Sequence, residues 1–272
     1  KKDNGYIEYD YFCATTLVYF FLDLLSKKVK SKFVIRDYLI YVLLATVCDV
    51  MPLRKLNRLI SLKALKDFKI NQNLVFDELF NLSLKKNKLN INDLGYLIGP
   101  ILNSGGRLGK SNYATELLSS DNYNVINKRS IELIKLNNKR KIIETATMNQ
   151  IDFKKIEKEN NNIIIYYNPN INEGLIGIIA ARLKDHFNKP AIVITLSNNI
   201  LKGSARSIYN YNIGRSIKNS LDHKIILNGG GHNMAAGFTL KKSNLKIFST
   251  FILNNFLKSG VSNNYTFSYD SE

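Results

Sequence analysis

The stretch IIIYYNPNINEGLIGIIAARLKDHFNKPAIVI, residues 163–194, decides the fold of this chain. It opens and closes on short runs rich in β-branched residues, Ile163–Tyr167 and Ala191–Ile194, which are typical of buried strands. Between them, residues 174–187 carry apolar side chains at helical spacing. A strand, a helix and a second strand in this order predict a small α/β domain.

The sequence that follows extends this domain. Ile225–Leu227 is a further short apolar run and predicts a third strand, which would end at the glycines 229–231. Leu245–Leu257 has helical spacing and predicts a closing helix. We therefore expect the α/β domain to cover residues 161–260 and a polar tail to follow at 261–272.

Upstream of this domain the apolar residues follow a helical period, from Tyr11 to about Ser120. Residues 125–159 contain no Pro or Gly and are rich in Lys, Glu, Asn and Ile, which is typical of one long, largely solvated helix. We expect a mostly helical region at 1–122 and a connecting helix at 123–160.

The charge favours a polyanionic partner, with nucleic acid ahead of an anionic membrane surface. The 272 residues include 39 Lys and Arg against 22 Asp and Glu, a formal net charge of +17. Only 9 of the 39 basic residues are Arg, and the chain is crowded with Lys, Asn and Ile. Such a bias also arises from drift in composition, so the charge alone leaves both interpretations open.

Cysteine usage indicates a reducing, cytoplasmic location. Cys13 and Cys48 have neither the number nor the spacing of a disulfide framework or a zinc site. The longest apolar run, Tyr38–Val47, is about half the length of a membrane span, so we expect no membrane segment. The first residues show no initiator Met or signal region, and the chain is expected to begin within a longer protein.

The first stretch that carries chemistry is LLATVCDVMPLRKLNRLI, residues 43–60. Asp49 stands there at the end of an apolar helix, just before Pro52. It is either a helix-terminal carboxylate that caps the next turn or a metal ligand, because a buried carboxylate needs a partner.

The second stretch is DLGYLIGPILNSGGRLG, residues 93–109. Asn103 offers an amide and Arg107 a planar guanidinium suited to phosphate, and Gly105 and Gly106 allow the backbone to approach a ligand. A turn between helices with a solvated Arg explains the same residues, so both interpretations stay open.

Two further stretches lie in the α/β domain. In LKGSARSI, residues 201–208, Arg206 and Ser207 can bind a phosphate, although a surface hairpin would use the same residues. In LNGGGHNMAAGF, residues 227–238, the glycines Gly229, Gly230 and Gly231 predict a turn whose N–H groups bind an anion, with His232 at its edge. A plain flexible turn is the alternative.

In this order and spacing, the stretches resemble the DHH phosphoesterase superfamily and, within it, the RecJ-like exonucleases. The Asp49 to Arg58 stretch is similar to the motif whose Asp ligates the catalytic divalent metal. The Asn103 to Leu108 stretch is similar to the next motif, which faces substrate phosphate. NEGLIGIIAARL from Asn172, LKGSARSI and GGGHNMAAGF resemble the DHHA1 domain, which grips a single strand. The resemblance runs from about Tyr11 to about Phe256.

The chain departs from this family pattern in two places. The two upstream Asp- and His-rich metal motifs on a Rossmann-like half do not occur in these residues, and Asp49 cannot hold a two-metal site alone. Asn172 stands where the family usually has His before Glu173 and Gly174, so no substrate contact is expected from it.

The resemblance implies that the complete protein is a 5′-to-3′ exonuclease of single-stranded DNA in repair and recombination, dependent on Mn²⁺ or Mg²⁺. In this chain it implies a metal ligand at Asp49 and strand contacts at Asn103, Arg107, Arg206, Ser207, His232 and the three glycines. The alternatives are a DHH oligoribonuclease or cyclic-dinucleotide phosphodiesterase, and a non-catalytic nucleic-acid-binding module such as the DHHA1-type appendage of alanyl-tRNA synthetases.

Overall fold

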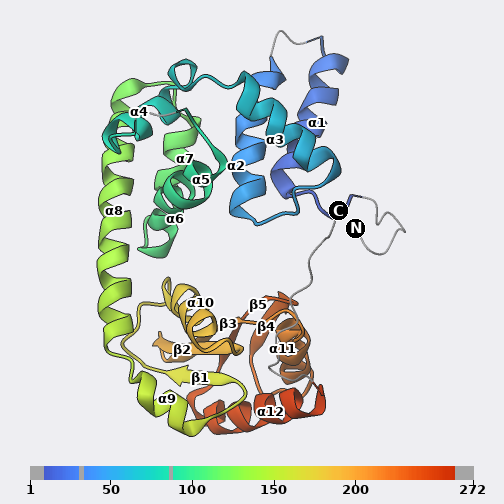
Figure 1. Ribbon diagram of the computed structural model, residues 1–272, viewed down its shortest axis with the longest axis vertical. Coiled ribbons are helices and arrows are strands. Elements are labelled where there is room, and N and C mark those ends of the chain that lie inside the picture. Colours follow the sequence, from blue (N-terminus) through green and yellow to red (C-terminus); the bar gives the residue numbers. More distant parts are fainter. Residues whose placement is uncertain (1–8, 31–33, 86–87, 261–272) are drawn as a thin grey trace, which may run out of the picture. The chain divides into compact units, whose positions relative to one another are not determined.

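The computed structural model describes residues 9–30, 34–85 and 88–260, which divide into two compact units between Asn138 and Lys139. The first unit is helical and the second contains a sheet (Figure 1). This arrangement confirms the α/β fold class with a helical first half.

Most helices of the first unit pack around one apolar core, to which the first helix contributes no residue. The helices of this unit are α1 Ala14–Lys28, α2 Leu39–Cys48, α3 Lys55–Asp67, α4 Leu74–Leu82, α6 Gly99–Arg107, α7 Asn112–Ser119 and the first part of α8 Tyr123–Asn149, with short turns η1 Ile35–Tyr38, η2 Ile70–Gln72, α5 Ile91–Asp93 and η3 Leu94–Ile98. Leu43, Phe76 and Leu94 are fully buried at its centre. Each such side chain contributes about 1.5–3 kcal/mol by leaving water.

The second unit contains, within the described residues, one five-stranded sheet. Its elements are α9 Phe153–Glu159, β1 Ile164–Tyr167, α10 Ile176–Phe187, β2 Ala191–Ser197, β3 Ile200–Arg206, α11 Ile213–Asp222, β4 Asn228–His232, β5 Ala235–Leu240, the short turn η4 Lys242–Asn244 and α12 Leu245–Lys258. The strand order is β1-β2-β3-β5-β4. The pair β1 and β2 is parallel and the other pairs are antiparallel.

The two faces of this sheet are covered differently. Ile192, Ile194 and Phe238 face a core that they share with Ile217 of α11 and Phe248 of α12. On the opposite face, α10 packs on β2 and β3 through a smaller apolar cluster. Figure 1 shows α10 and α12 on opposite sides of the strands.

The connecting helix expected at 123–160 is wrong as a single element. It breaks after Asn149, and a second helix, α9, begins at Phe153. Ile151 is buried in the cluster under α10, and the Asp152 side chain accepts a hydrogen bond from the Lys155 backbone N–H, 3.0 Å away. A buried anchor beside a helix N-cap redirects the chain there. The helix does end at Asn160, as expected, because Asn160 adopts a left-handed conformation.

The third strand expected at Ile225–Leu227 is also wrong. These residues form a bend whose Ile225 N–H donates to the Ser220 carbonyl. The strand is the next segment, β4, which contains the three glycines. Two strands were not expected, β3 and β5, because LKGSARSI was interpreted as a phosphate-binding cluster or a surface hairpin and LNGGGHNMAAGF as an anion-binding or flexible turn.

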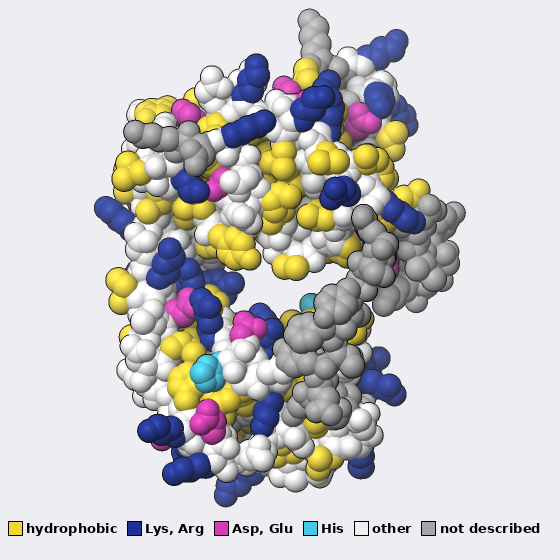
Figure 2. Space-filling view, viewed as in Figure 1, with side chains coloured by type: hydrophobic (Ala, Val, Ile, Leu, Met, Phe, Trp, Pro, Cys, Tyr) yellow, Lys and Arg dark blue, Asp and Glu magenta, His cyan; other side chains and the backbone are white. Residues whose placement is uncertain are grey.

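Basic side chains do not concentrate in one place on the visible face of Figure 2. On the face that Figure 2 shows, Lys and Arg are scattered over both units and lie between hydrophobic side chains. The net charge therefore identifies no binding site by itself, and the site must be located from geometry. No helix in the described ranges has the length and apolar character needed to cross a lipid bilayer.

Candidate nucleic-acid interface

The part of the sheet formed by β3, β5 and β4 has a face that α11 and α12 do not cover; α10 packs against its β3 side, next to Ser204 and Arg206. Along β3, Leu201, Gly203 and Ala205 are buried on the α11 and α12 side, so Lys202, Ser204 and Arg206 point to the other side. The pairing register extends this face into three rows: Arg206 with Ala235 and His232, Ser204 with Gly237 and Gly230, and Lys202 with Thr239 and Asn228. We call these nine residues the open face.

Glycines form the centre of the open face. A Cβ added to Gly230 would meet no atom within 4 Å, and one added to Gly237 would meet only the Gly203 carbonyl oxygen, at 3.9 Å. Both residues are exposed. A ligand can therefore approach the bare backbone of the sheet at this position.

Arg206 is held at the edge of these glycines by neutral groups. Its Nη1 donates to Ser204 Oγ at 3.1 Å and to the Ala205 carbonyl at 2.9 Å. A Cβ added to Gly177, in the first turn of α10, would lie 3.0 Å from Arg206 Nη2, so the guanidinium packs closely against this turn. Burial lowers the pKa of Arg206 from its usual value. The group stays charged at neutral pH, since arginine titrates far above it.

No carboxylate neutralises this guanidinium. None of the ion pairs among the described residues involves Arg206, whereas the guanidiniums of Arg129, Arg140 and Arg182 each contact a Glu carboxylate. Arg206 is half-buried. A half-buried cation without a carboxylate favours an external anion, because the charge has lost part of its hydration.

His232 lies in the same row as Arg206, at the end of β4. Its side chain is exposed, and its Nδ1 accepts a hydrogen bond from the Met234 N–H at 3.4 Å. The first turn of α11 approaches its backbone so closely that a Cβ on Gly214 would lie 2.7 Å from the His232 carbonyl oxygen. The position of His232 is thus fixed by packing.

The predicted anion-binding turn of glycines is wrong. Gly229, Gly230 and Gly231 form strand β4, and none of them has a positive φ. Gly229 and Gly231 face the covered side, where an added Cβ would lie 2.7 Å from Ile226 Cδ1 and 2.4 Å from the Ala235 carbonyl oxygen. They are glycines because the chain packs tightly there. Only Gly230 belongs to the open face.

Ser207 also lies outside the open face, contrary to its predicted phosphate contact. Its side chain is buried, and its hydroxyl donates to the Tyr211 carbonyl at 2.6 Å. The hydroxyl therefore closes a turn of the chain. Burial could not be read from the adjacency of Ser207 to Arg206 in the sequence.

The members of the open face that the sequence analysis missed follow from strand periodicity. Lys202, Ser204 and Arg206 are spaced by two residues, which places them on one face once β3 is recognised as a strand. Gly237 and Thr239 follow in the same way from β5. The Lys202 ammonium pairs with Glu173 at 2.7 Å, so it is partly neutralised.

In the first unit, Asp49 lies in a clamped turn at the end of α2. The next residue, Val50, has φ 52, a left-handed conformation that β-branched residues rarely adopt. Buried Asn57 holds the turn by donating from Nδ2 to the carbonyls of Pro52 at 3.0 Å and Tyr11 at 2.8 Å. The exposed Asp49 carboxylate accepts no hydrogen bond within the described ranges, so the interpretation as a helix cap gains no support.

The residues near Asp49 do not fit a complete metal site. The described residues contain no group of three or more His, Cys, Asp or Glu side chains that could hold a metal ion. A catalytic site for paired Mg²⁺ or Mn²⁺ needs several carboxylate and imidazole ligands. Asp49 can supply one of them, and these residues carry no hydrolytic step by themselves.

Asn103 and Arg107 lie on α6, one turn apart, and not in a loop. Asn103 is exposed and Arg107 is half-buried. Gly105 is needed for packing, since an added Cβ would lie 2.5 Å from the Lys110 carbonyl oxygen, whereas Gly106 is open. The glycine pair thus combines one structural position with one exposed position.

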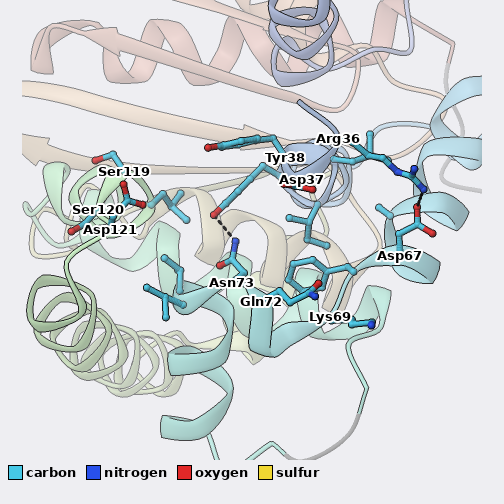
Figure 3. A pocket seen from close by; sticks show the side chains of 18 residues that line it. Arg36, Asp37, Tyr38, Asp67, Lys69, Gln72, Asn73, Ser119, Ser120 and Asp121 are labelled. Carbon is cyan, nitrogen blue, oxygen red and sulfur yellow. Dashed lines mark hydrogen bonds and ion pairs between the residues drawn. The ribbon is translucent and has the colours of Figure 1, made fainter. Parts of the chain in front are cut away.

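A cavity of the first unit is a poor phosphate site. It has a volume of about 690 Å³ and lies between η1, the α3 to α4 segment and the end of α7 (Figure 3). Its Arg36 is held by the Asp67 carboxylate, and hydrogen bonds from Lys63 and Arg36 lower the pKa of Asp67 to about 2. Asp37 and Asp121 add further negative charge.

Comparison with known proteins finds a known domain family in the second unit. Residues 160–258 match the DHHA1 domain family. The chain is 31% identical to the single-stranded-DNA-specific exonuclease RecJ of Haemophilus influenzae over 224 residues, which cover 78% of this chain and 39% of that protein. It is 33% identical to RecJ of Bacillus subtilis over 202 residues, covering 73% and 25%, and 32% identical to RecJ of Escherichia coli over 221 residues, covering 76% and 38%.

Solved structures agree on the fold. RecJ of Thermus thermophilus in complex with Mg²⁺ superposes with a TM-score of 0.73 at 22% identity, covering 86% of this chain and 36% of that one. An exonuclease RecJ bound to manganese gives 0.67 at 22% identity, covering 86% and 58%. The chain spans about two fifths or less of the length of the curated relatives above. Residues 160–258 are therefore a DHHA1 domain, in a chain that resembles RecJ over about three quarters of its length.

Proposed function

We propose that the open face binds the sugar-phosphate backbone of single-stranded DNA, with Arg206 clamping a phosphate and His232 beside it. The observation that carries this proposal is the half-buried Arg206 guanidinium, which no carboxylate of the described residues neutralises and which lies next to the bare glycines of the sheet. The planar guanidinium of an Arg can donate two parallel hydrogen bonds to one phosphate.

The proposal extends to a longer RecJ-like protein. That protein would remove nucleotides from the 5′ end of single-stranded DNA in the cytoplasm, in repair and recombination, using Mg²⁺ or Mn²⁺. Residues 1–122 would be the C-terminal part of its DHH catalytic domain. Asp49 would contribute one carboxylate to its metal site, and Asn103 and Arg107 would face substrate phosphate. The relatives named above as single-stranded-DNA-specific exonucleases support this proposal.

The test is equilibrium binding of a fluorescently labelled single-stranded oligodeoxynucleotide to the 272-residue chain, with duplex DNA and single-stranded RNA as competitors. We expect single-stranded DNA to bind best. Arg206→Ala should weaken binding at least tenfold, because a charge-assisted bond is worth about 1.5–3 kcal/mol. Lys139→Ala, which removes an exposed charge on α8, should have little effect.

Two outcomes would contradict the proposal. Equal losses for Arg206→Ala and Lys139→Ala would mean that binding is only diffuse attraction between the basic chain and the polyanion. Preferred binding of RNA would favour the oligoribonuclease alternative.

A further inference from the structure

Two turns are joined at the end of the open face where Arg206 and His232 lie. One turn connects β3 to α11 and the other connects β4 to β5. The Ser207 N–H donates to the Met234 carbonyl at 2.9 Å, and Asn212 Nδ2 donates to Asn233 Oδ1 at 2.7 Å. The two turns therefore form one connected rim beside the open face.

The first of these turns is rigid at both ends. Ser207 is fixed by its bond to the Tyr211 carbonyl, and the Tyr211 N–H donates to the Ile208 carbonyl at 3.2 Å. The Tyr211 ring is buried, its hydroxyl lies 2.7 Å from Ser216 Oγ, and it packs against Phe256. A backbone held in this way gives a defined position to the middle one of the three residues between Ser207 and Tyr211.

That residue is Tyr209, and its side chain is 90% exposed. Met234, on the joined turn, adds a second apolar side chain that is 40% exposed. A single exposed aromatic residue needs no explanation. Here the aromatic ring projects from a fixed turn, and the Tyr209 Cα is at most about 11 Å from that of Arg206, because Tyr209 is the third residue after it.

A fixed, exposed aromatic ring beside a cation is the arrangement that grips a single nucleic-acid strand. The cation holds the backbone, while an unpaired base stacks on the ring, whatever its identity. A duplex offers no free base face within its stack. The open face accounts for phosphate binding, and its one aromatic residue is His232, which we place beside the phosphate, so a base needs a further ring on which to stack.

We propose that Tyr209 is a base-stacking residue that confers single-strand preference on this interface. The proposal rests on the proposed function, since it assumes that a strand is gripped at Arg206. It predicts that Tyr209 contacts the base of a nucleotide close to the phosphate held by Arg206. It also assigns Ser207 a role: its hydroxyl positions the Tyr209 turn.

The test compares three variants on two ligands. The variants are Tyr209→Ala, Tyr209→Phe and the control Tyr96→Ala, which removes an equally exposed tyrosine from the first unit. The ligands are a labelled single-stranded oligodeoxynucleotide and a strand of the same length that lacks its bases throughout. Affinities are measured at several salt concentrations.

On the normal strand, Tyr209→Ala should bind about tenfold more weakly, or about 1.4 kcal/mol, within the range measured for base stacking. Tyr209→Phe and Tyr96→Ala should bind like the unchanged chain. The salt dependence should stay the same, because no charge is removed. On the base-free strand, Tyr209→Ala should cause no further loss.

The results separate this inference from the function on which it rests. If Arg206→Ala weakens binding and Tyr209→Ala does not, stacking is overturned and the phosphate grip stands. If Tyr209→Ala weakens binding equally on both strands, the ring acts through the fold and the inference is also overturned. If neither variant weakens binding, the open face is not the interface and both proposals fail.

Discussion

At the scale of single residues, the site depends on what surrounds a side chain more than on its type. Arg206 and Ser207 are neighbours in sequence and both are suited to phosphate. The strand directs Arg206 to the open face, whereas the next residue is buried and its hydroxyl is used within the chain. Sequence alone could identify the pair, but it could not separate them, because burial is decided by contacts distant in the chain.

A prediction at this scale concerns the geometry of the Arg206 clamp. Arg206→Lys keeps the charge but loses the planar fork, so affinity for single-stranded DNA should fall about tenfold, on the order of 1–2 kcal/mol. The slope of log affinity against log salt should barely move, because Lys still neutralises the phosphate. Loss of one phosphate contact would change this slope by about 0.7. Titration of a labelled oligonucleotide at several salt concentrations measures both. A loss no larger than that of Lys139→Ala would argue against the clamp.

A second prediction concerns Asp67, whose pKa is lowered to about 2 by hydrogen bonds from Lys63 and Arg36. The ordinary pKa of Asp is 3.8, so the unfolded chain takes up the proton first as pH falls. The stabilisation is therefore complete above about pH 4 and is lost as pH falls through about 2. Asp67→Asn should be less stable than the unchanged chain at pH 6, and the difference should shrink toward pH 2. Urea unfolding across this pH range measures it; a constant difference would contradict the assignment.

At the scale of elements, the glycines of the sheet serve two purposes. A Cβ on Gly203 would lie 2.1 Å from the Phe238 ring, so this glycine makes room for a core aromatic residue. Gly230 has no atom within 4 Å, and it leaves the backbone open. The glycine-rich stretches were interpreted as turns or a hairpin, whereas in the structure they form strands.

These two glycines give opposite predictions for stability and binding. Gly203→Ala should lower the free energy of unfolding by about 1–3 kcal/mol through overpacking. Gly230→Leu should leave it nearly unchanged and should weaken DNA binding by covering the open face. Urea unfolding and oligonucleotide titration of both variants test this contrast. A Gly230→Leu protein that binds normally would exclude this face from the interface.

A buried carboxylate connects α8 to α10. Glu144 accepts hydrogen bonds from Arg140 at 2.6 Å and Arg182 at 2.9 Å, and only 8% of its side chain is exposed. Glu144→Ala should lower the free energy of unfolding by about 2–3 kcal/mol, below the 3–5 typical of fully buried pairs because Arg182 is largely exposed. Asp185→Ala, which removes an exposed pair, should cost less than about 1 kcal/mol. Similar losses for the two variants in urea unfolding would show that the buried Glu144 network contributes no more to stability than an exposed ion pair.

Helices and strands with strong periodicity could be predicted from sequence, and the local exceptions could not. The apolar runs at β1 and β2 and the helices α10 and α12 follow from spacing alone. The break after Asn149 depends on burial of Ile151 under α10. Strand β4 forms because β5 and α11 pack against residues that lack a Cβ. Both are effects of tertiary contacts that no local pattern contains.

At the scale of the whole molecule, the proposed binding face and the proposed metal ligand lie in different units. The open face lies in the second unit, which follows Asn138, and Asp49 lies in the first. The resemblance to RecJ-like exonucleases pointed to both regions, because each of them contains motif residues that can be found in the sequence. It could not give the open face, because the face exists only when β3, β4 and β5 are aligned in register.

The last prediction follows from this separation: the 272-residue chain should bind single-stranded DNA without hydrolysing it. The open face can hold a strand by itself, but Asp49 provides one carboxylate where paired metal ions need several ligands. Incubation of a 5′-labelled strand with Mn²⁺ or Mg²⁺ should release no nucleotides above background. Asp49→Asn should leave the affinity unchanged, because that carboxylate is not part of the open face. One of the RecJ relatives, assayed in parallel as a positive control, verifies that the substrate can be cleaved under these metal conditions. Metal-dependent release by the chain that disappears in Asp49→Asn would show instead that a complete metal site forms within these residues.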